Sequence, residues 1–207
     1  MTRIILARHG VTKYNMEGRV QGSLQTPLHR KGLQQAKLLG RRLKDEQIDA
    51  AYSSCLRRAV QTAKEVLKFH PRIGLCRMRE LNERSFGAVE GFTFKEVEKY
   101  PGILSERSAA VDHRFKPEKG ESWGEVRRRA MGAVRKIIEA HGDGTVFIAA
   151  HGGTNRMLLS GLIGLPIQKA FVFRQHNACI NIIDVRGGGV VRVERLNDTT
   201  HLEGMPT

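Results

Sequence analysis

Short apolar runs alternate along this chain with longer stretches in which apolar residues recur every three or four positions. The runs predict buried strands, and the three-to-four spacing predicts amphipathic helices. Strands are expected over residues 3–7, 50–52, 73–78 and 145–150, and helices over residues 33–43, 56–67, 126–138 and 157–162. Two further runs, 178–185 and 190–196, flank three consecutive glycines and predict a closing hairpin. This alternation favours an α/β layered domain.

Polar residues mark the starts of two of these helices. Ser53 or Ser54 is in position to cap the helix over residues 56–67, and Ser122 with Glu125 forms the pattern of a capping box. The stretch between residues 81 and 120 is instead rich in glycine and proline, which predicts loops and short helices there.

No repeat, low-complexity tract or linker divides the chain, so residues 1–207 are expected to form a single domain. The three cysteines, Cys55, Cys76 and Cys179, have neither the number nor the spacing of a disulfide framework or a zinc site. The first apolar run is too short for a signal peptide, and no run is long enough to cross a membrane. We therefore expect a cytoplasmic protein without membrane association.

The charge balance narrows the class of partner. Lys and Arg number 35 against 21 Asp and Glu, a formal net charge of +14. Such a field attracts polyanions or small anionic substrates, and it also arises from an arginine-rich solvated surface. Only 6% of the residues are aromatic and no basic segment is interleaved with them. We therefore expect a small phosphorylated metabolite and no nucleic acid as partner.

Two predicted strands end in the same way, with a histidine followed by glycine. These are Arg8-His9-Gly10 and His151-Gly152-Gly153. Sites in α/β sheets form at the carboxyl ends of strands, so neighbouring strands would bring the two imidazoles together. Glycine after each histidine lets the backbone approach a ligand closely. The pair indicates a functional site, whereas a lone histidine at a strand end is more often structural.

Arginine beside such a site indicates binding of phosphate, because its planar fork makes bidentate bonds and keeps its charge. Arg8 adjoins His9, and Arg58 lies near the start of a predicted helix, where anions are also favoured. In a chain this basic, the alternative for any single arginine is a solvated surface side chain.

With these motifs the chain resembles the histidine phosphatase superfamily, also called the phosphoglycerate mutase-like family. The resemblance covers nearly the whole chain. It rests on Arg8-His9-Gly10-x-Thr12-x-x-Asn15, Gly18-Arg19-x-Gln21-Gly22, Ser53-Ser54-x-Leu56-x-Arg58-Ala59, Leu81-x-Glu83-x-x-Phe86-Gly87-x-x-Glu90-Gly91, Gly120-Glu121-Ser122 and His151-Gly152-Gly153. It implies a three-layer αβα sandwich with a mostly parallel central sheet.

The resemblance also implies catalytic roles. His9 matches the nucleophile that becomes phosphohistidine, and Arg8, Arg58 and a protonated His151 match the groups around the phosphoryl oxygens. Glu83 matches the acid that protonates the leaving oxygen and then helps to activate water. Glu80 and Glu90 are nearby rivals, and family spacing from Phe86-Gly87, not local chemistry, favours Glu83.

Four further residues match the phosphate and substrate side of the pocket: Asn15, Gln21, Gly22 and Gly152. No cluster of metal ligands is evident, and no cofactor is expected, because fixed cations can neutralise the phosphoryl group. A phosphatase acting on small phosphomonoesters is therefore the favoured function. The oligomeric state stays open between monomer and homodimer.

Two alternatives remain. A phosphoglycerate mutase would return the phosphoryl group to the bound intermediate, but mutases of the family tend to carry longer loops and a longer C-terminal tail. A catalytically inactive anion-binding relative would also have the fold, but every catalytic position here holds the expected residue type. Residues 196–202 resemble the tails of phosphatase members, including those acting on α-ribazole phosphate.

Overall fold

A six-stranded sheet forms the centre of the protein, as the computed structural model describes it for residues 1–99 and 113–205. The strands are β1 (Thr2–Arg8), β2 (Ala50–Ser54), β3 (Leu75–Met78), β4 (Thr145–Ala150), β5 (Ile180–Val185) and β6 (Val191–Asp198). Their order is β3-β2-β4-β1-β5-β6. The first four run parallel, and β5 and β6 run antiparallel to their neighbours. The sheet is thus mostly parallel, as expected.

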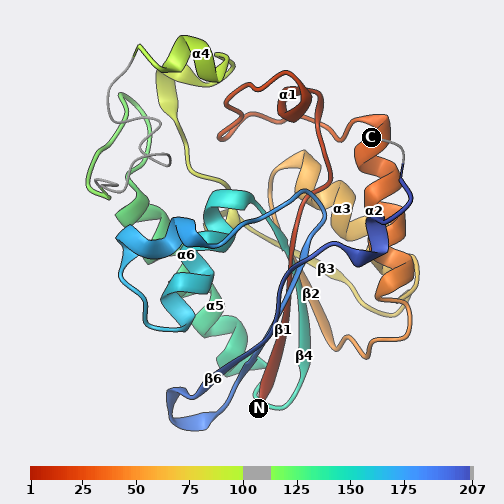
Figure 1. The fold of residues 1–207 in the computed structure, drawn as a ribbon. Coiled ribbons are helices and arrows are strands. Elements are labelled where there is room, and N and C mark those ends of the chain that lie inside the picture. Colours follow the sequence, from red (N-terminus) through yellow and green to blue (C-terminus); the bar gives the residue numbers. More distant parts are fainter. Residues whose placement is uncertain (100–112, 206–207) are drawn as a thin grey trace.

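Helices cover both faces of this sheet (Figure 1). The α-helices are α1 (Lys13–Met16), α2 (Arg30–Arg42), α3 (Arg57–Leu67), α4 (Phe94–Val97), α5 (Trp123–Ala140) and α6 (Gly152–Leu162). Short 3-10 turns are η1 (Arg79–Leu81), η2 (Gly87–Val89), η4 (Ile167–Val172), η5 (Gly187–Gly189) and η6 (Thr200–Leu202). α2 and α3 lie on one face and α5 and α6 on the other. This confirms the three-layer αβα fold.

The middle of strand β1, residues 4–7, is apolar because it is buried on both faces. Ile4 and Leu6 pack with the α5 and α6 side of the core, and Ile5 and Ala7 pack with the α2 and α3 side. Successive side chains of a strand point to opposite faces, so a central strand between two helical layers needs an unbroken apolar run. All four side chains are at most 1% exposed.

Most predicted elements are confirmed, with shifted ends. The Ser122 side chain and Glu125 form the expected capping box of α5, and the closing hairpin forms from β5 and β6. The predicted cap of α3 is wrong, since the N-cap residue is Leu56 and makes no side-chain cap bond. Ser54 still belongs to β2, where it pairs with Met78, so the helix begins later than expected.

Residues 79–99 contain η1, η2 and α4 joined by loops, in agreement with the loops and short helices predicted for the glycine-rich stretch that begins at residue 81. Residues 100–112, with Pro101 and Gly102, lie outside the described residues. Within the described residues, no helix is both long and apolar enough to cross a membrane.

A backbone contact between the end of β1 and the first turn of α2 fixes the loop that follows β1. A Cβ atom on Gly10 would lie 2.4 Å from the carbonyl oxygen of Gly32, and a Cβ on Gly32 would lie 2.0 Å from the carbonyl oxygen of Val11. The His29 N–H donates to the same Val11 oxygen at 3.0 Å. Only glycine permits this approach, so α2 holds the loop that carries His9.

We therefore expect Gly32→Ala to lower the free energy of unfolding by about 1–3 kcal/mol, because backbone must move to admit the methyl group. The matched control is Gly132→Ala inside α5, where a Cβ would meet no atom within 4 Å. That change should raise stability by about 0.5–1 kcal/mol through helix propensity. Urea unfolding followed by circular dichroism measures both, and equal effects would contradict the contact.

Candidate active site

The parallel pairing of β1 with β4 brings the two His-Gly motifs together. In the register of these strands Arg8 lies opposite Ala150, so both strands end at the same level. The His9 N–H donates to the Ala150 carbonyl oxygen at 3.1 Å. The rings of His9 and His151 lie 5.2 Å apart between centroids, tilted by 58°. The expectation that the two imidazoles meet at the carboxyl ends of neighbouring strands is confirmed.

His9 is held with one ring nitrogen engaged and the other directed at an arginine. Its Nδ1 lies 2.7 Å from the carbonyl oxygen of Gly10, which can only accept, so Nδ1 carries the proton. Nε2 then has a lone pair, which accepts a hydrogen bond from Arg58 Nε at 3.2 Å. Burial, followed by the charges of Arg58 and Arg8, holds the pKa of His9 well below its ordinary value. The buried ring is therefore neutral at neutral pH.

Arg58 reaches this position from the first turn of α3. Its guanidinium also donates to the carbonyl oxygens of Gly22 at 2.7 Å and Leu24 at 2.8 Å, and to the Thr26 hydroxyl at 3.3 Å. Although burial lowers the pKa of Arg58 to about 10, the group stays charged at neutral pH. The loop over residues 22–26 therefore clamps a buried cation beside His9.

His151 approaches the same point from the end of β4, where it is the N-cap residue of α6. The Ser54 hydroxyl accepts the Leu56 N–H at 3.2 Å and shares a hydrogen bond with His151 Nε2, 2.7 Å away. The other ring nitrogen, Nδ1, is a buried atom with no hydrogen-bond partner among the described residues. Burial, then the charges of Arg58, His9 and Arg8, lowers the pKa of His151 well below its usual value.

The carboxylate of Glu83 is oriented by the start of α6. Its oxygens accept the N–H groups of Gly153 at 2.9 Å and Thr154 at 3.1 Å, and the Thr154 hydroxyl at 3.2 Å. The two rival glutamates lie elsewhere. Glu80 is exposed, and Glu90 binds Ser23 together with the backbone of Phe86. Of these three carboxylates, only Glu83 lines the pocket described below.

An arginine from α5 fixes the loop that carries Glu83. Arg129 donates to the carbonyl oxygens of Glu80, Asn82 and Glu83 at 2.6, 2.7 and 3.1 Å. The same guanidinium forms a two-point ion pair with Glu121 at 2.8 and 2.9 Å. The sequence context of Arg129 alone indicates a solvated side chain, because it is the last of three consecutive arginines on one helix.

Asn15, Gln21 and Gly22 line the same pocket as Arg58. The amide oxygen of Asn15 accepts the Thr12 N–H at 3.1 Å, and that of Gln21 accepts the Thr12 and Thr26 hydroxyls at 2.8 and 2.7 Å. Because the side-chain amide oxygens of Asn15 and Gln21 already accept hydrogen bonds, the groups of these two side chains that remain for a ligand are the NH₂ donors.

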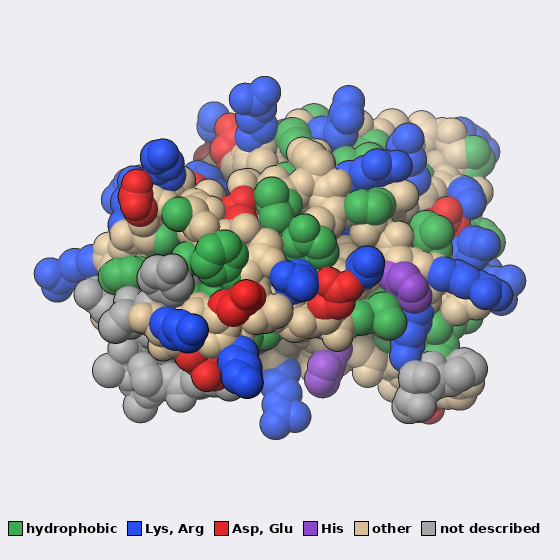
Figure 2. Space-filling view, turned by 90° about the horizontal axis from the view of Figure 1, so that it is seen from above, with side chains coloured by type: hydrophobic (Ala, Val, Ile, Leu, Met, Phe, Trp, Pro, Cys, Tyr) green, Lys and Arg blue, Asp and Glu red, His purple; other side chains and the backbone are tan. Residues whose placement is uncertain are grey.

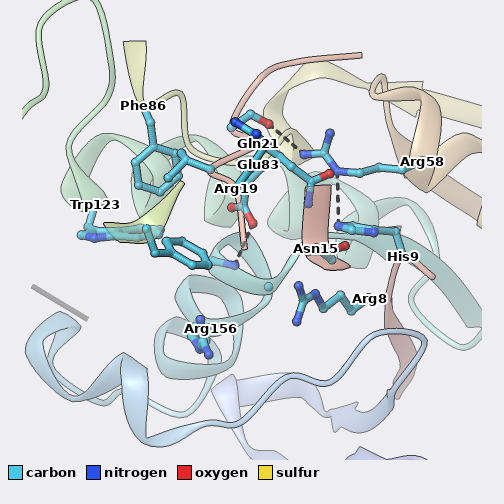
Figure 3. Close-up of a pocket in the computed structure, with 15 residues that line it drawn as sticks. Arg8, His9, Asn15, Arg19, Gln21, Arg58, Glu83, Phe86, Trp123 and Arg156 are labelled. Atoms are coloured by element: carbon cyan, nitrogen blue, oxygen red, sulfur yellow. Dashed lines mark hydrogen bonds between the residues drawn. The ribbon is translucent and has the colours of Figure 1, made fainter. Parts of the chain in front are cut away.

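All the predicted site residues except His151 line one pocket, and His151 contacts it through His9. Figure 3 shows Arg8, His9, Arg58 and Glu83 around this pocket. Among the described residues, no group of three or more His, Cys, Asp or Glu side chains is placed to hold a metal ion.

Sequence reasoning missed part of the wall: Arg19, Val20, Phe86, Phe94, Trp123, Gly153 and Arg156. Of Gly152 and Gly153, it is Gly153 that leaves no room for a side chain. A Cβ atom on Gly153 would lie 2.6 Å from both Glu83 and Trp123. One signal for Trp123 was available. It is the only tryptophan of the chain and follows the capping serine of α5.

The fold and the pocket agree with comparisons to known proteins. The family described as histidine phosphatase superfamily (branch 1) matches residues 4–199. The chain belongs to this superfamily. A metal-independent phosphoserine phosphatase from Arabidopsis thaliana is 32% identical to this histidine phosphatase, over 99% of this chain and 85% of the relative. With phosphoserine phosphatases among its relatives, the protein is a phosphoric monoester hydrolase, as predicted.

Two solved structures place the fold in the same family. YhfR from Bacillus stearothermophilus superposes with a TM-score of 0.89 at 33% identity, covering 98% of this histidine phosphatase and all of YhfR. A phosphoserine phosphatase mutant (H9A) from Entamoeba histolytica, solved in complex with phosphoserine, has a TM-score of 0.86 at 26% identity. The match covers 98% of this chain and 100% of the Entamoeba histolytica chain.

The two buried imidazoles predict a pH dependence of stability. Because the folded state lowers the pKa of both rings, the unfolded chain binds more protons below about pH 6.5. The free energy of unfolding should therefore fall as the pH drops from 7.5 to 5.5, with a smaller slope in His9→Ala, which lacks one ring. Urea unfolding at several pH values in phosphate-free buffer measures this, and the same slope in both proteins would contradict it.

Proposed function

We propose that the protein hydrolyses small phosphomonoesters through a phosphohistidine intermediate on His9. The observation that carries this proposal is the geometry of that ring. Nδ1 is bound to the Gly10 carbonyl, so the Nε2 lone pair is presented beside the Arg58 guanidinium. A fixed, neutral imidazole next to a buried cation is suited to attack a phosphoryl group that the cation binds.

In the first step the Arg58 Nε–H passes from His9 Nε2 to a phosphoryl oxygen. The freed Nε2 lone pair forms a bond to phosphorus while the bond from phosphorus to the ester oxygen breaks. Glu83 in its protonated form donates its proton to the departing oxygen. In the second step water attacks phosphorus and loses a proton to Glu83. The N–P bond then breaks, which returns the electron pair to His9 and releases inorganic phosphate.

Arg8, Arg58 and His151 are proposed to stabilise the phosphoryl oxygens, where charge accumulates during both steps. The two guanidiniums carry permanent charge. In the tautomer whose proton is on Nδ1, His151 can serve without becoming charged, because that nitrogen has no other described partner. A bound phosphoryl dianion would also favour protonation of the His151 ring. The protonated His151 that the resemblance implies is therefore proposed for the complex with substrate.

Substrate capture is supported by charge at longer range. Lys and Arg side chains are scattered over the face seen from above in Figure 2, near its middle as well as along its margin, and are not gathered into one stripe. This distribution suits attraction of a small anion more than tracking of a polymer. The phosphoserine phosphatases among the relatives make phosphoserine a first compound to test, and hydrolysis is favoured over mutase chemistry.

Replacement of the nucleophile should remove turnover. His9→Ala is expected to lower kcat for p-nitrophenyl phosphate by about a thousandfold or more, in buffer without added metal. Acid-labile, base-stable phosphate should label the wild-type protein after rapid quenching and be absent from the variant. The control is His70→Ala, outside the pocket, which should keep its activity. Retained activity in His9→Ala would reject the assignment.

Loss of the acid should depend on the leaving group. Glu83→Gln is expected to slow alkyl phosphates by about 10²–10⁴-fold, because an alkoxide needs a proton to depart, and p-nitrophenyl phosphate by much less. Glu80→Gln, an exposed neighbour, is the matched control. Steady-state rates over a series of leaving groups measure the effect, and equal slowing of all esters would argue against Glu83 as the acid.

A further inference from the structure

The carboxylate of Glu90 joins two of the loops that form the wall of the pocket. From the first loop, the Ser23 N–H donates to the Oε1 atom at 2.9 Å and the Ser23 hydroxyl donates to Oε2 at 2.8 Å. From the second loop, the Phe86 N–H and the Ser85 hydroxyl donate to Oε1 at 2.9 and 3.2 Å. Unlike Glu83, Glu90 is not part of the described lining of the pocket, and the proposed chemistry gives it no role.

The first of these loops holds the buried cation of the site. Arg58 donates to the carbonyl oxygens of Gly22 at 2.7 Å and Leu24 at 2.8 Å, the residues on either side of Ser23. The same guanidinium is hydrogen-bonded to the proposed nucleophile (Figure 3). Because both carbonyls belong to the segment that Glu90 binds, the position of the guanidinium depends on that carboxylate.

Gly22 lies against the Glu90 carboxylate with no space between them. Its φ is +47°, in the left-handed region, and a Cβ atom on it would lie 2.1 Å from Glu90 Oε1. Any other residue at this position would have to push the loop and the carboxylate apart. The loop is therefore packed on the carboxylate as well as hydrogen-bonded to it.

The carboxylate can act as an acceptor that fixes the loop, or as a charge that supports Arg58. Burial lowers the pKa of Arg58 to about 10, and the charges of Glu83 and Glu90 oppose this shift. The contacts favour the first role, because donors from both loops meet at Oε1, where a neutral amide oxygen can also accept them. Among the described residues, Glu90 and Arg58 share no hydrogen bond.

We propose that Glu90 is a positioning residue for phosphoryl binding, which fixes the loop over residues 22–26 and, through that loop, the guanidinium of Arg58. This inference rests on the proposed phosphatase function and adds to it a residue that does not touch the substrate. Groups that bind a reacting phosphoryl unit need such support, because a misplacement of about 1 Å can cost about a hundredfold in rate.

Removal of the carboxylate should leave the fold intact. The Gly91 N–H donates to the Val20 carbonyl oxygen at 2.8 Å, and the Val20 N–H donates to the Phe92 oxygen at 2.9 Å. These backbone bonds hold the two segments together independently of the Glu90 side chain. Loss of the side chain is therefore expected to displace residues 22–24 without unfolding the wall.

The test measures the affinity for inorganic phosphate by isothermal titration calorimetry, which needs no turnover. Glu90→Ala, which removes the acceptor and the charge, should weaken binding about tenfold or more. Glu90→Gln keeps an oxygen in place of Oε1 and should stay within about threefold of wild type. Glu90→Asp keeps the charge but is too short to reach both loops, and should bind nearly as weakly as the alanine variant.

Wild-type affinity in Glu90→Ala would overturn the inference, and so would a glutamine variant as weak as the alanine variant. Circular dichroism checks that each variant is folded. If the alanine variant does not fold, the glutamine and aspartate variants decide the question, since tighter binding in Glu90→Asp than in Glu90→Gln would assign the effect to charge and overturn the inference.

A double-mutant cycle separates action through Arg58 from a general structural effect. The kcat/KM for p-nitrophenyl phosphate is measured for Glu90→Ala, for Arg58→Gln and for the double variant. If Glu90 acts through the guanidinium, its removal should change kcat/KM by no more than about twofold once Arg58 is replaced. Two effects that multiply in full would show that Glu90 acts independently of Arg58 and would contradict the proposal.

Glu96→Ala is the matched control. Glu96 also accepts a backbone N–H and a hydroxyl, both from Thr93 at the start of α4 and not from residues 22–26. This variant should keep the wild-type affinity for phosphate. Normal phosphate binding by Glu90→Ala beside an active wild-type protein rejects the role of Glu90 alone, whereas a wild-type protein that neither binds phosphate nor hydrolyses p-nitrophenyl phosphate rejects the proposed function too.

Discussion

The parallel hydrogen bonding of β1 to β4 is the contact on which the candidate site depends. It sets Arg8 level with Ala150, so the two chain segments leave the sheet side by side. A shift of one residue would turn the side chains of a whole strand to the opposite face. Because β1 is apolar toward both helical layers, its own sequence would not oppose such a shift. The bond from the His9 N–H to the Ala150 carbonyl extends the register one residue beyond the strand and completes it.

Burying a charged guanidinium and two imidazoles at the carboxyl ends of β1 and β4 destabilises the folded state. Isolated buried ions cost several kcal/mol even after relaxation, and Arg58 is only 1% exposed. Its donors are matched by backbone carbonyls and a hydroxyl, which satisfy them without a carboxylate. The charge is therefore stabilised but not neutralised. A site of this kind keeps an affinity for anions that a buried salt bridge would have removed. Burial, and after it the charge of the arginines, keeps both histidines neutral.

The strands and helices could be predicted because the spacing of apolar residues along the chain reflects which side chains are buried. The ends of β1 and β4 could be recognised as one site because a His-Gly pair follows each strand. The role of Ser54 could not be predicted, since local spacing made it look like a helix cap when its hydroxyl in fact bonds to His151. Arg129 and Arg156 were missed for a related reason. Each lies on a helix in a chain rich in arginine, and only the packing of distant segments distinguishes a positioning or lining arginine from a solvated one.

The two ends of the pocket are built from different kinds of structure. Arg8, His9 and His151 follow strand ends, and Arg58 lies in the first turn of a helix that packs on the sheet, so their positions follow from the core itself. The outer wall instead combines Arg19 and Phe94 with Trp123 from the start of α5. The segments that carry Arg19 and Phe94 are joined by backbone hydrogen bonds, from the Val20 N–H to the Phe92 oxygen at 2.9 Å and from the Phe94 N–H to the Gly18 oxygen at 2.8 Å, and they lie outside the central sheet. A change in the outer wall can therefore alter which leaving group is accepted while the groups around the phosphoryl position stay in register. This separation explains why the sequence predicted the chemistry of the site more fully than its choice of substrate.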